Sequence, residues 1–524
     1  MASEFTDELT RPRRLAASRF LPLLLLIPFS LLANDPALAQ SADDESNDKP
    51  AAEEAQDAEE RPTFREEVEI RERVDDLTGI AATSSEGVSG RLSLQARPIQ
   101  RAGELVETVP GMIATQHSGD GKANQYFVRG FNLDHGTDFR LTVAGMPVNM
   151  PSHGHGQGYA DLNFVIPEMV SRMRFAKGTA LAEGGDFSAA GRADIELMDV
   201  LPEGFVELSL GEYDYRRAVF GESFSVGRGT LTTALEVHGN DGPWLRGNDF
   251  ERVNGYVRYS QGDGVRGWSL TAMAYDASWL STDQVPQRAI DSGAIDRFGL
   301  IDPGPRGDSS RYSLSSDWRW GDDSSTTHLN LYTMTYDLNL ISNFTYFLED
   351  PERGDQFQQV DDRSITGGSL RHHRMTELGG RSAEWSLGFE VRFDDIDNGL
   401  FRTQNLTRFG TVRSDSIEQL GLGAFGELSV DLSDKVRATL GLRVDSFDAD
   451  VDSVLAANTG SADDVQVSPK LALAFGPWNK TEVFVNAGYG FHSNDARGAT
   501  IRIDPVNGEA VTPVDPLVRA FGTE

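Results

Sequence analysis

The chain has 524 residues and a formal net charge of −33, from 48 Lys and Arg against 81 Asp and Glu. This acidic balance excludes a nucleic-acid-binding surface, which needs clustered positive charge. The chain has no cysteine, so disulfides and thiolate sites are excluded. Its mean hydropathy of −0.37 is too polar for a helical membrane protein but suits a barrel with a watery interior.

Residues 1–39 have the pattern of a secretory signal peptide. Four arginines between positions 11 and 19 precede an apolar run over residues 20–33, and Ala37-Leu38-Ala39 provides a small-residue cleavage site. The run is shorter than the roughly 20 residues of a membrane-spanning helix and contains Pro22 and Pro28, which disfavours the alternative of a transmembrane anchor. We therefore expect cleavage after Ala39.

Residues 40–63 are predicted to be a disordered acidic arm. Nine acidic and two basic residues lie between positions 40 and 62 without apolar periodicity, so burial cannot offset the entropy of ordering. In the next segment, residues 64–72, Glu66-Glu67-Val68-Glu69-Ile70 alternates acidic and apolar side chains. This alternation indicates either an extended peptide that pairs with the sheet edge of a partner or a plain linker strand.

Residues 73–200 are predicted to form a small α/β domain. Short apolar strands separated by glycines are expected at residues 126–128, 141–143, 170–175 and 193–197. Four glycine motifs follow one another in this domain, namely Pro110-Gly111, Arg129-Gly130-Phe131, Ala144-Gly145 and Lys177-Gly178. Because glycine permits tight turns and close backbone approach, these motifs are expected at the ends of helices and strands.

Beyond residue 201 the dominant pattern has a period of two. Apolar residues occupy every second position at Trp385, Leu387, Phe389, Val391 and Phe393, with polar or small residues between them. Such alternation predicts strands with one face toward lipid and the other toward water. Several runs approach the roughly 9 to 11 residues of a membrane strand and exceed the usual strand of a soluble β-sandwich.

About thirteen such strands are expected between residues 205 and 491, joined alternately by short turns and long polar loops. Single-chain bacterial barrels close with an even number of strands. Residues 201–524 are therefore predicted to form an incomplete antiparallel barrel, with an unpaired last strand near residues 483–491 or Val518. On this expectation the 524 residues are an inactive truncated product or a fragment rather than a complete transporter.

The motif order, followed by the alternating region, resembles the plug and barrel of TonB-dependent outer-membrane receptors. The resemblance runs from residue 64 to the end, with departures at Ala144-Gly145, where an aspartate usually precedes the glycine, and at Gly191-Arg192, where two glycines are usual. It implies an antiparallel membrane β-barrel with an α/β plug inside, in the outer membrane of a Gram-negative cell. It also implies that Glu67, Val68, Glu69 and Ile70 form a TonB box that pairs with the energy-transducing TonB complex.

The function that the resemblance implies is active uptake of a scarce nutrient. Ferric siderophores are the commonest cargo in the family, with metal ions, cobalamin or carbohydrates as alternatives. Motifs of nucleophilic and phosphate chemistry are missing from the sequence, so neither catalysis nor a cofactor is expected. The rival functions are a non-transporting binding protein or adhesin of the outer membrane and, with less support, a porin, whose open lumen would not hold a plug.

One cluster of residues points to metal chemistry. His153 and His155 stand two apart on a predicted flexible loop, His135 and Asp138 lie on the preceding loop, and His117 lies before that. Imidazole and carboxylate bind Zn, Ni or Cu, so this loop is either a contact for an imported metal or metal chelate or merely polar. Weaker metal candidates are His372, His373 and His492 with Asn494 and Asp495, and Arg129 and Asp138 are candidates for structural ion pairs.

Overall fold

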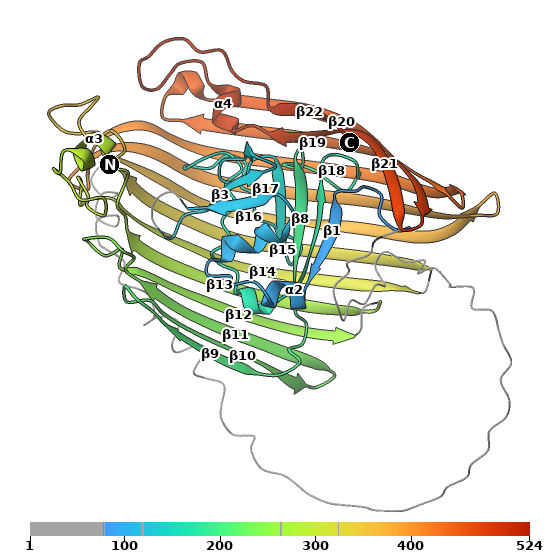
Figure 1. The fold of residues 1–524 in the computed structure, drawn as a ribbon. Coiled ribbons are helices and arrows are strands. Elements are labelled where there is room, and N and C mark those ends of the chain that lie inside the picture. Colours follow the sequence, from blue (N-terminus) through green and yellow to red (C-terminus); the bar gives the residue numbers. More distant parts are fainter. Residues whose placement is uncertain (1–76, 78, 117–119, 263–264, 323) are drawn as a thin grey trace, which may run out of the picture. The chain divides into compact units, whose positions relative to one another are not determined.

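The structure is a computed structural model, and it describes residues 77, 79–116, 120–262, 265–322 and 324–524. These residues lie within one compact unit, Ile70–Glu524, and form a small plug and a large sheet (Figure 1). The predicted signal peptide, the acidic arm, the candidate TonB box at residues 67–70 and His117 all lie outside the described residues.

The plug contains two small sheets, with strand orders β1-β7-β8-β5-β6 and β2-β3-β4. Their bounds are β1 Glu86–Gly90, β2 Met112–Thr115, β3 Gln125–Val128, β4 Phe131–Asn132, β5 Phe139–Val143, β6 Met146–Pro147, β7 Val170–Lys177 and β8 Gly191–Leu197. Three short helices complete it, namely α2 (Arg91–Gln95), η1 (Ala102–Thr108) and η2 (Pro167–Met169). The four strands predicted in this region coincide with β3, β5, β7 and β8.

The rest of the described chain is dominated by one antiparallel sheet of fourteen strands in sequence order. The strands are β9 Phe205–Leu210, β10 Arg216–Val226, β11 Gly229–Asn240, β12 Phe250–Gly262, β13 Gly267–Leu280, β14 Arg306–Asp322, β15 Ser325–Ser342, β16 Phe357–Leu378, β17 Arg381–Gln404, β18 Thr407–Ser433, β19 Val436–Ser453, β20 Gly460–Trp478, β21 Thr481–Ser493 and β22 Leu517–Thr523. Among the described strands, β9 pairs only with β10 and β22 only with β21, so the sheet is open.

The predicted strand number needs one correction. The thirteen strands expected between residues 205 and 491 correspond to β9 through β21, and β22 adds a fourteenth. The argument from an odd number of strands is therefore wrong, although the sheet is open as expected. The count of thirteen ended at residue 491, although the sequence analysis named Val518, which lies in β22, as a possible last strand.

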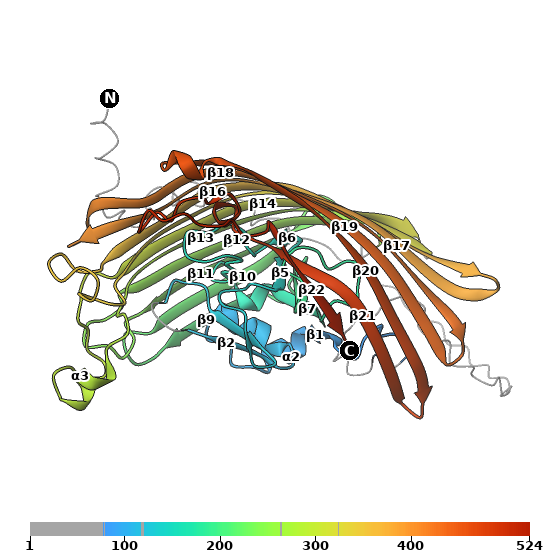
Figure 2. The ribbon, with the colours of Figure 1, turned by 90° about the horizontal axis from the view of Figure 1, so that it is seen from above.

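The period of two separates an apolar outer face from a polar inner face. In β17 the side chains of Leu387 and Phe389 are 54% and 48% exposed, whereas Asp394 is 1% exposed. In β19 Leu440 is 58% exposed, whereas Arg443 is 2% exposed. The plug lies against the concave, polar face of the curved sheet (Figure 2), so the charged side chains of the sheet are buried beneath it.

The two rims of the sheet differ. Residues 227–228, 379–380, 434–435 and 479–480 form short turns on one rim, which we call the tight rim. The opposite, elaborated rim carries the connections 281–305 with α3 (Gln287–Asp291), 343–356, 454–459 with η3 (Ala456–Asn458) and 494–516 with α4 (Ala496–Thr500). The β17–β18 turn is an exception on the elaborated rim, since it consists of Asn405 and Leu406 alone. None of the helices in the described ranges is long and apolar enough to span a membrane.

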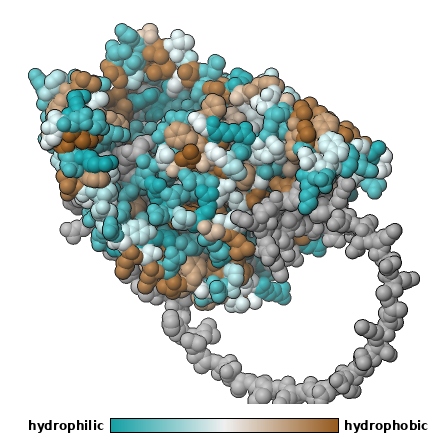
Figure 3. Space-filling view, viewed as in Figure 1, coloured by the Kyte–Doolittle hydropathy of each residue, from teal (hydrophilic) through white to brown (hydrophobic). Residues whose placement is uncertain are grey.

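Apolar packing also joins the plug to the sheet. Leu105 and Ile195 of the plug belong to the same buried cluster as Tyr256 and Met273 of the sheet. A second buried cluster gathers residues of β17, β18, β19, β21 and β22 around Ala496 of α4. The face that carries the plug mixes hydrophilic and hydrophobic residues (Figure 3).

Candidate functional site

The glycine motifs of the plug lie in turns, as expected. Gly111, Gly130, Gly145 and Gly178 all have positive φ, at +83°, +85°, +76° and +79°. Gly145 lies between β5 and β6, and a Cβ there would come within 2.7 Å of the Asn330 side chain on β15. At this position glycine is required both by the backbone conformation and by the close approach of the barrel.

Three of the motifs meet near Ser85 at the tight rim. The Arg129 backbone N–H donates to the Gly111 carbonyl at 2.8 Å, and Lys177 Nζ donates to the Pro110 carbonyl at 2.8 Å. Arg129 Nη2 donates to Ser85 Oγ at 2.7 Å, and the Lys177 backbone N–H donates to the Ser85 carbonyl at 3.1 Å. Phe131, at the end of this turn, is 73% exposed. The three motifs thus lie around residue 85, at the end of the segment with which the described plug begins.

That entering segment, residues 79–85, is fastened to the tight rim of the sheet. Gly79 N–H donates to Glu482 Oε2 at 2.8 Å, and Arg437 Nη1 donates to the Gly79 carbonyl at 2.6 Å. The Glu524 carboxylate accepts bonds from Thr83 Oγ1 at 2.6 Å and Ser84 Oγ at 2.7 Å. The first described part of the plug is therefore held where the short turns lie.

The middle of the plug is held by a buried group of charges, which we call the central charged cluster. Arg140 of β5 forms a bidentate pair with Glu390 of β17, with N–O distances of 3.1 and 3.0 Å. Arg443 of β19 donates to the same carboxylate at 2.8 Å and to Asp445 at 2.9 Å. Glu183 of the plug pairs with Arg192 and with Arg371 of β16. Carboxylates and guanidiniums from both parts thus neutralise one another out of water.

Residues 150–158 of the plug form a loop that we call the histidine loop. His153 stacks on Tyr159 with ring centroids 4.1 Å apart and an interplanar angle of 9°. His135 and His155 lie beside the same tyrosine, and their own ring centroids are 4.9 Å apart. The structure therefore brings His135, His153 and His155 together around one aromatic ring.

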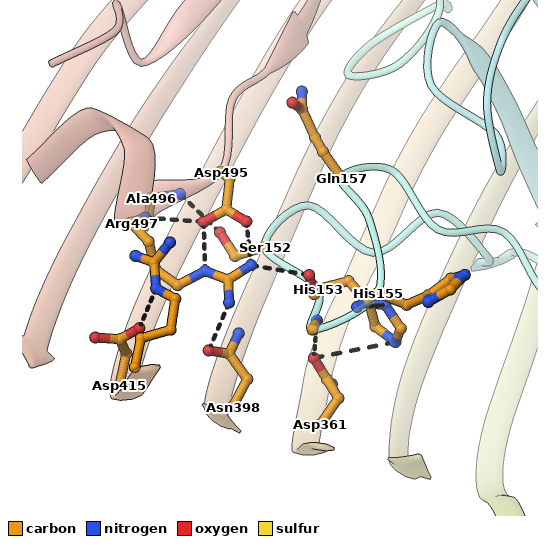
Figure 4. Close-up of polar contacts among 12 residues, drawn as sticks. Ser152, His153, His155, Gln157, Asp361, Asn398, Asp415, Asp495, Ala496 and Arg497 are labelled. Carbon is orange, nitrogen blue, oxygen red and sulfur yellow. Dashed lines mark hydrogen bonds and ion pairs between the residues drawn. The ribbon is translucent and has the colours of Figure 1, made fainter. Parts of the chain in front are cut away.

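Strand β16 binds the centre of this loop (Figure 4). Gly154 N–H donates to Asp361 Oδ2 at 2.8 Å, and Gln359 Nε2 donates to the Gly154 carbonyl at 2.8 Å. A Cβ on Gly154 would lie 2.6 Å from the Val360 carbonyl oxygen, so glycine allows the loop to rest on the strand backbone. The expected flexible loop is thus bound to the wall of the sheet by hydrogen bonds.

The histidines of the loop are neutral near pH 7. Burial lowers the pKa of both His153 and His155 well below the ordinary value of 6.5, and nearby Arg363 and Arg497 lower that of His153 further. His153 Nδ1 accepts the His155 backbone N–H at 3.1 Å, which assigns the proton of the neutral ring to Nε2. Nε2 lies 4.0 Å from Asp361 Oδ2.

The remaining candidates are placed elsewhere. Asp138 Oδ1 lies 2.6 Å from His492 Nδ1 of β21, and Arg129 lies 3.9 Å from Glu524, the residue after β22. Both candidates therefore have an ionisable partner outside the plug, while Arg129 also donates to Ser85 within the plug. His372 bonds Thr327 Oγ1 at 2.8 Å, and His373 lies 3.4 Å from Glu384. In the part of the chain that the structure describes, no group of three or more His, Asp or Glu side chains is placed to hold a metal ion.

Comparison with known protein families agrees with this architecture. Residues 80–192 match the TonB-dependent receptor plug domain, and residues 210–514 match the TonB-dependent receptor-like β-barrel. The chain belongs to the TonB-dependent receptor family. Members of this family are outer-membrane receptors rather than enzymes. A search of curated proteins finds no match.

Solved receptor structures share the fold at low sequence identity. The unliganded ferric citrate transporter FecA is 14% identical with a TM-score of 0.64, over 78% of this chain and 62% of its own. The copper transporter OprC is 16% identical with a TM-score of 0.61, over 82% and 66%. The ferric yersiniabactin receptor FyuA from Yersinia pestis is 15% identical with a TM-score of 0.60, over 78% and 65%. The receptor thus spans less than two thirds of the length of these structures.

Sequence reasoning missed the barrel side of the site. Inward-facing Arg and Asp residues two positions apart pair with each other, as at Asp361/Arg363, Arg392/Asp394, Arg413/Asp415, Arg443/Asp445 and Asp495/Arg497. Four of these arginines also donate to plug carbonyls, at Ser152 from Arg363, Asn149 from Arg392, Glu183 from Arg443 and His153 from Arg497. For the four pairs that lie in strands, the spacing of two was a readable signal in the sequence, because residues two apart share one face of a strand. This argument does not apply to Asp495 and Arg497, which lie in the β21–β22 connection.

Proposed function

We propose that the receptor takes up a scarce nutrient across the outer membrane with energy from TonB, and that its cargo is a ferric siderophore or another metal chelate. The observation that carries this proposal is the plug on the concave face of the sheet, with its entering segment 79–85 fastened at the tight rim. In this arrangement a pull on the preceding arm would act first on the bonds to Arg437, Glu482 and Glu524.

Deletion of residues 64–72 in the native gene tests the energy coupling. We expect iron-starved cells that carry the deletion to lose uptake of radiolabelled ferric citrate and still to bind it at the surface. Without the TonB box there is no extended peptide to pair with the partner's sheet edge. The matched control is a deletion of equal length in the acidic arm, residues 48–56, which should leave uptake intact. Uptake that stays unchanged in the first strain would mean that another receptor carries it, and would instead indicate a non-transporting binding protein or adhesin.

We further propose that the histidine loop contacts the metal-bearing cargo. The loop lies toward the elaborated rim, because its partners Gln359 and Asp361 stand near the start of β16 and Gln157 Nε2 bonds the carbonyl of Ser493 at the end of β21. Neutral imidazole is the form that ligates metals. Since the described residues offer no complete metal-binding set, the cargo would bring its own ligands, and His155, which is partly exposed, would add one contact.

His155→Ala should weaken binding roughly tenfold and leave the thermal midpoint of unfolding unchanged. His153→Ala behaves differently, because His153 is 1% exposed and stacked on Tyr159, so its removal leaves a cavity that costs about 1 to 3 kcal/mol. Tryptophan fluorescence with ferric citrate and with copper(II) measures binding. Equal affinity of wild type and His155→Ala for both probes would reject the contact.

A further inference from the structure

The end of β21 and the start of the β21–β22 connection contact three separate segments of the plug. His492 Nδ1 lies 2.6 Å from Asp138, and Ser493 donates through N–H and Oγ to the Asp186 carboxylate at 2.7 and 2.6 Å. The Ser493 carbonyl accepts Gln157 Nε2 at 2.7 Å. Residues 492–497 therefore lie against the loops of the plug that face the elaborated rim.

Arg497 joins three parts of the molecule through one guanidinium (Figure 4). Its Nη2 donates to the His153 carbonyl of the plug at 2.9 Å, and its Nη1 donates to Asn398 Oδ1 of β17 at 2.9 Å. Its Nε donates to Asp495 at 2.8 Å, so the charge is neutralised within the connection itself. Arg497 is 8% exposed. Because the guanidinium is planar and rigid, it can bond all three partners only when the plug loop and the connection keep this relative position.

A second bond lies directly beside it. Ala496 N–H donates to Ser152 Oγ at 2.8 Å, and Ala496 is fully buried in the apolar cluster beneath α4. Among the Arg/Asp pairs that reach plug carbonyls, the other three lie in barrel strands, whereas Asp495 and Arg497 lie in a connection of the elaborated rim. Through this pair, a connection of the elaborated rim binds the plug in the same way as the barrel strands do.

We propose that Arg497 is a positioning residue that couples the β21–β22 connection, residues 494–516, to the histidine loop, so that the two move as one unit. A displaced histidine loop would leave the Arg497 guanidinium and the Ala496 N–H without their plug acceptors, and the start of the connection would loosen with it. Conversely, a displaced connection would release His153. If the proposed transport function holds, movement of the plug is passed to the cell surface by this route, but the coupling itself needs neither cargo nor TonB.

Hydrogen exchange on the purified full chain, without cargo, tests the coupling from the barrel side. Arg497→Gln should speed exchange of the backbone amides in residues 150–158 about tenfold, which is an ordinary coupling magnitude. None of the backbone N–H groups of this loop bonds Arg497 directly in the described contacts, so faster exchange there reports movement of the loop. Arg502→Gln, in the same connection and exposed, is the matched control and should change nothing in the loop.

The reciprocal variant separates coupling from a local structural role. Ser152→Ala, on the plug, should speed exchange at Gly498 and Ala499 of α4, whose amides bond Asp495 rather than the plug. The effects of the two variants should not add in the double variant, because the two bonds belong to one connected network. Arg497→Lys keeps the positive charge but loses the planar guanidinium. We therefore expect the amides of residues 150–158 to exchange as fast in Arg497→Lys as in Arg497→Gln. The proposal would be overturned if each variant sped hydrogen exchange only in its own segment, the histidine loop or the β21–β22 connection. Additive increases in the double variant would also overturn it.

Discussion

Glu390→Gln should destabilise the receptor by about 3 to 5 kcal/mol, since it removes one partner from a buried charge cluster. The Glu390 carboxylate binds Arg140 of the plug through both oxygens and also accepts Arg443 of β19. Arg443 keeps Asp445 in the variant, whereas Arg140 keeps at most one of its two bonds, to the amide oxygen, and the NH2 group of the glutamine replaces the second acceptor. A guanidinium left in the interior without a full countercharge favours release of the plug from the sheet.

Thermal unfolding of the purified full chain, together with limited proteolysis of the plug, measures this effect. The matched control is Asp395→Asn on the same strand, because Asp395 is exposed and the alternation of β17 directs it away from the plug. We expect the Glu390 variant to expose plug cleavage sites at temperatures where the control is still resistant. If the two variants have the same midpoint and the same cleavage pattern, the central charged cluster does not hold the plug.

The architecture was predictable because its signals are local. The period of two at Leu387, Phe389 and Phe393 depends only on neighbouring positions, and those side chains are exposed on the outer face as expected. The motif glycines could be placed in turns for the same reason, since a positive φ is a property of the single residue. The fourteenth strand was not counted because β22 follows β21 only after the long connection 494–516.

The functional contacts were not predictable in the same way. His153 and Arg497 are separated by 344 positions, and Gly154 and Asp361 by 207, so no local pattern brings them together. Proximity of two histidines in sequence suggested a mobile metal loop, whereas the structure binds that loop to β16. The Arg-x-Asp spacing would have identified the inward charges of the wall, but not which plug carbonyls they reach.

Asp361→Asn should release the histidine loop and destabilise the receptor by about 3 to 5 kcal/mol. Asp361 is fully buried and accepts Arg363 Nε at 2.6 Å, Arg363 Nη2 at 2.8 Å and the Gly154 N–H at 2.8 Å. Asparagine cannot carry the negative charge, and its amide group would place a donor against Arg363 or Gly154. Among the residues that the structure describes, Arg363 would then keep only Asp394, at 3.7 Å, as an acidic partner.

Because Arg363 also donates to the Ser152 carbonyl, a shift of its guanidinium moves the loop at two points at once. Hydrogen exchange should therefore rise across residues 150–158 as the thermal midpoint falls. Asp362→Asn is the matched control, since Asp362 is the next residue of β16, is exposed and faces away from the plug. Identical loop exchange in the two variants would mean that the loop keeps its place without the Asp361 carboxylate, and that Gln359 and the arginine contacts suffice to hold it.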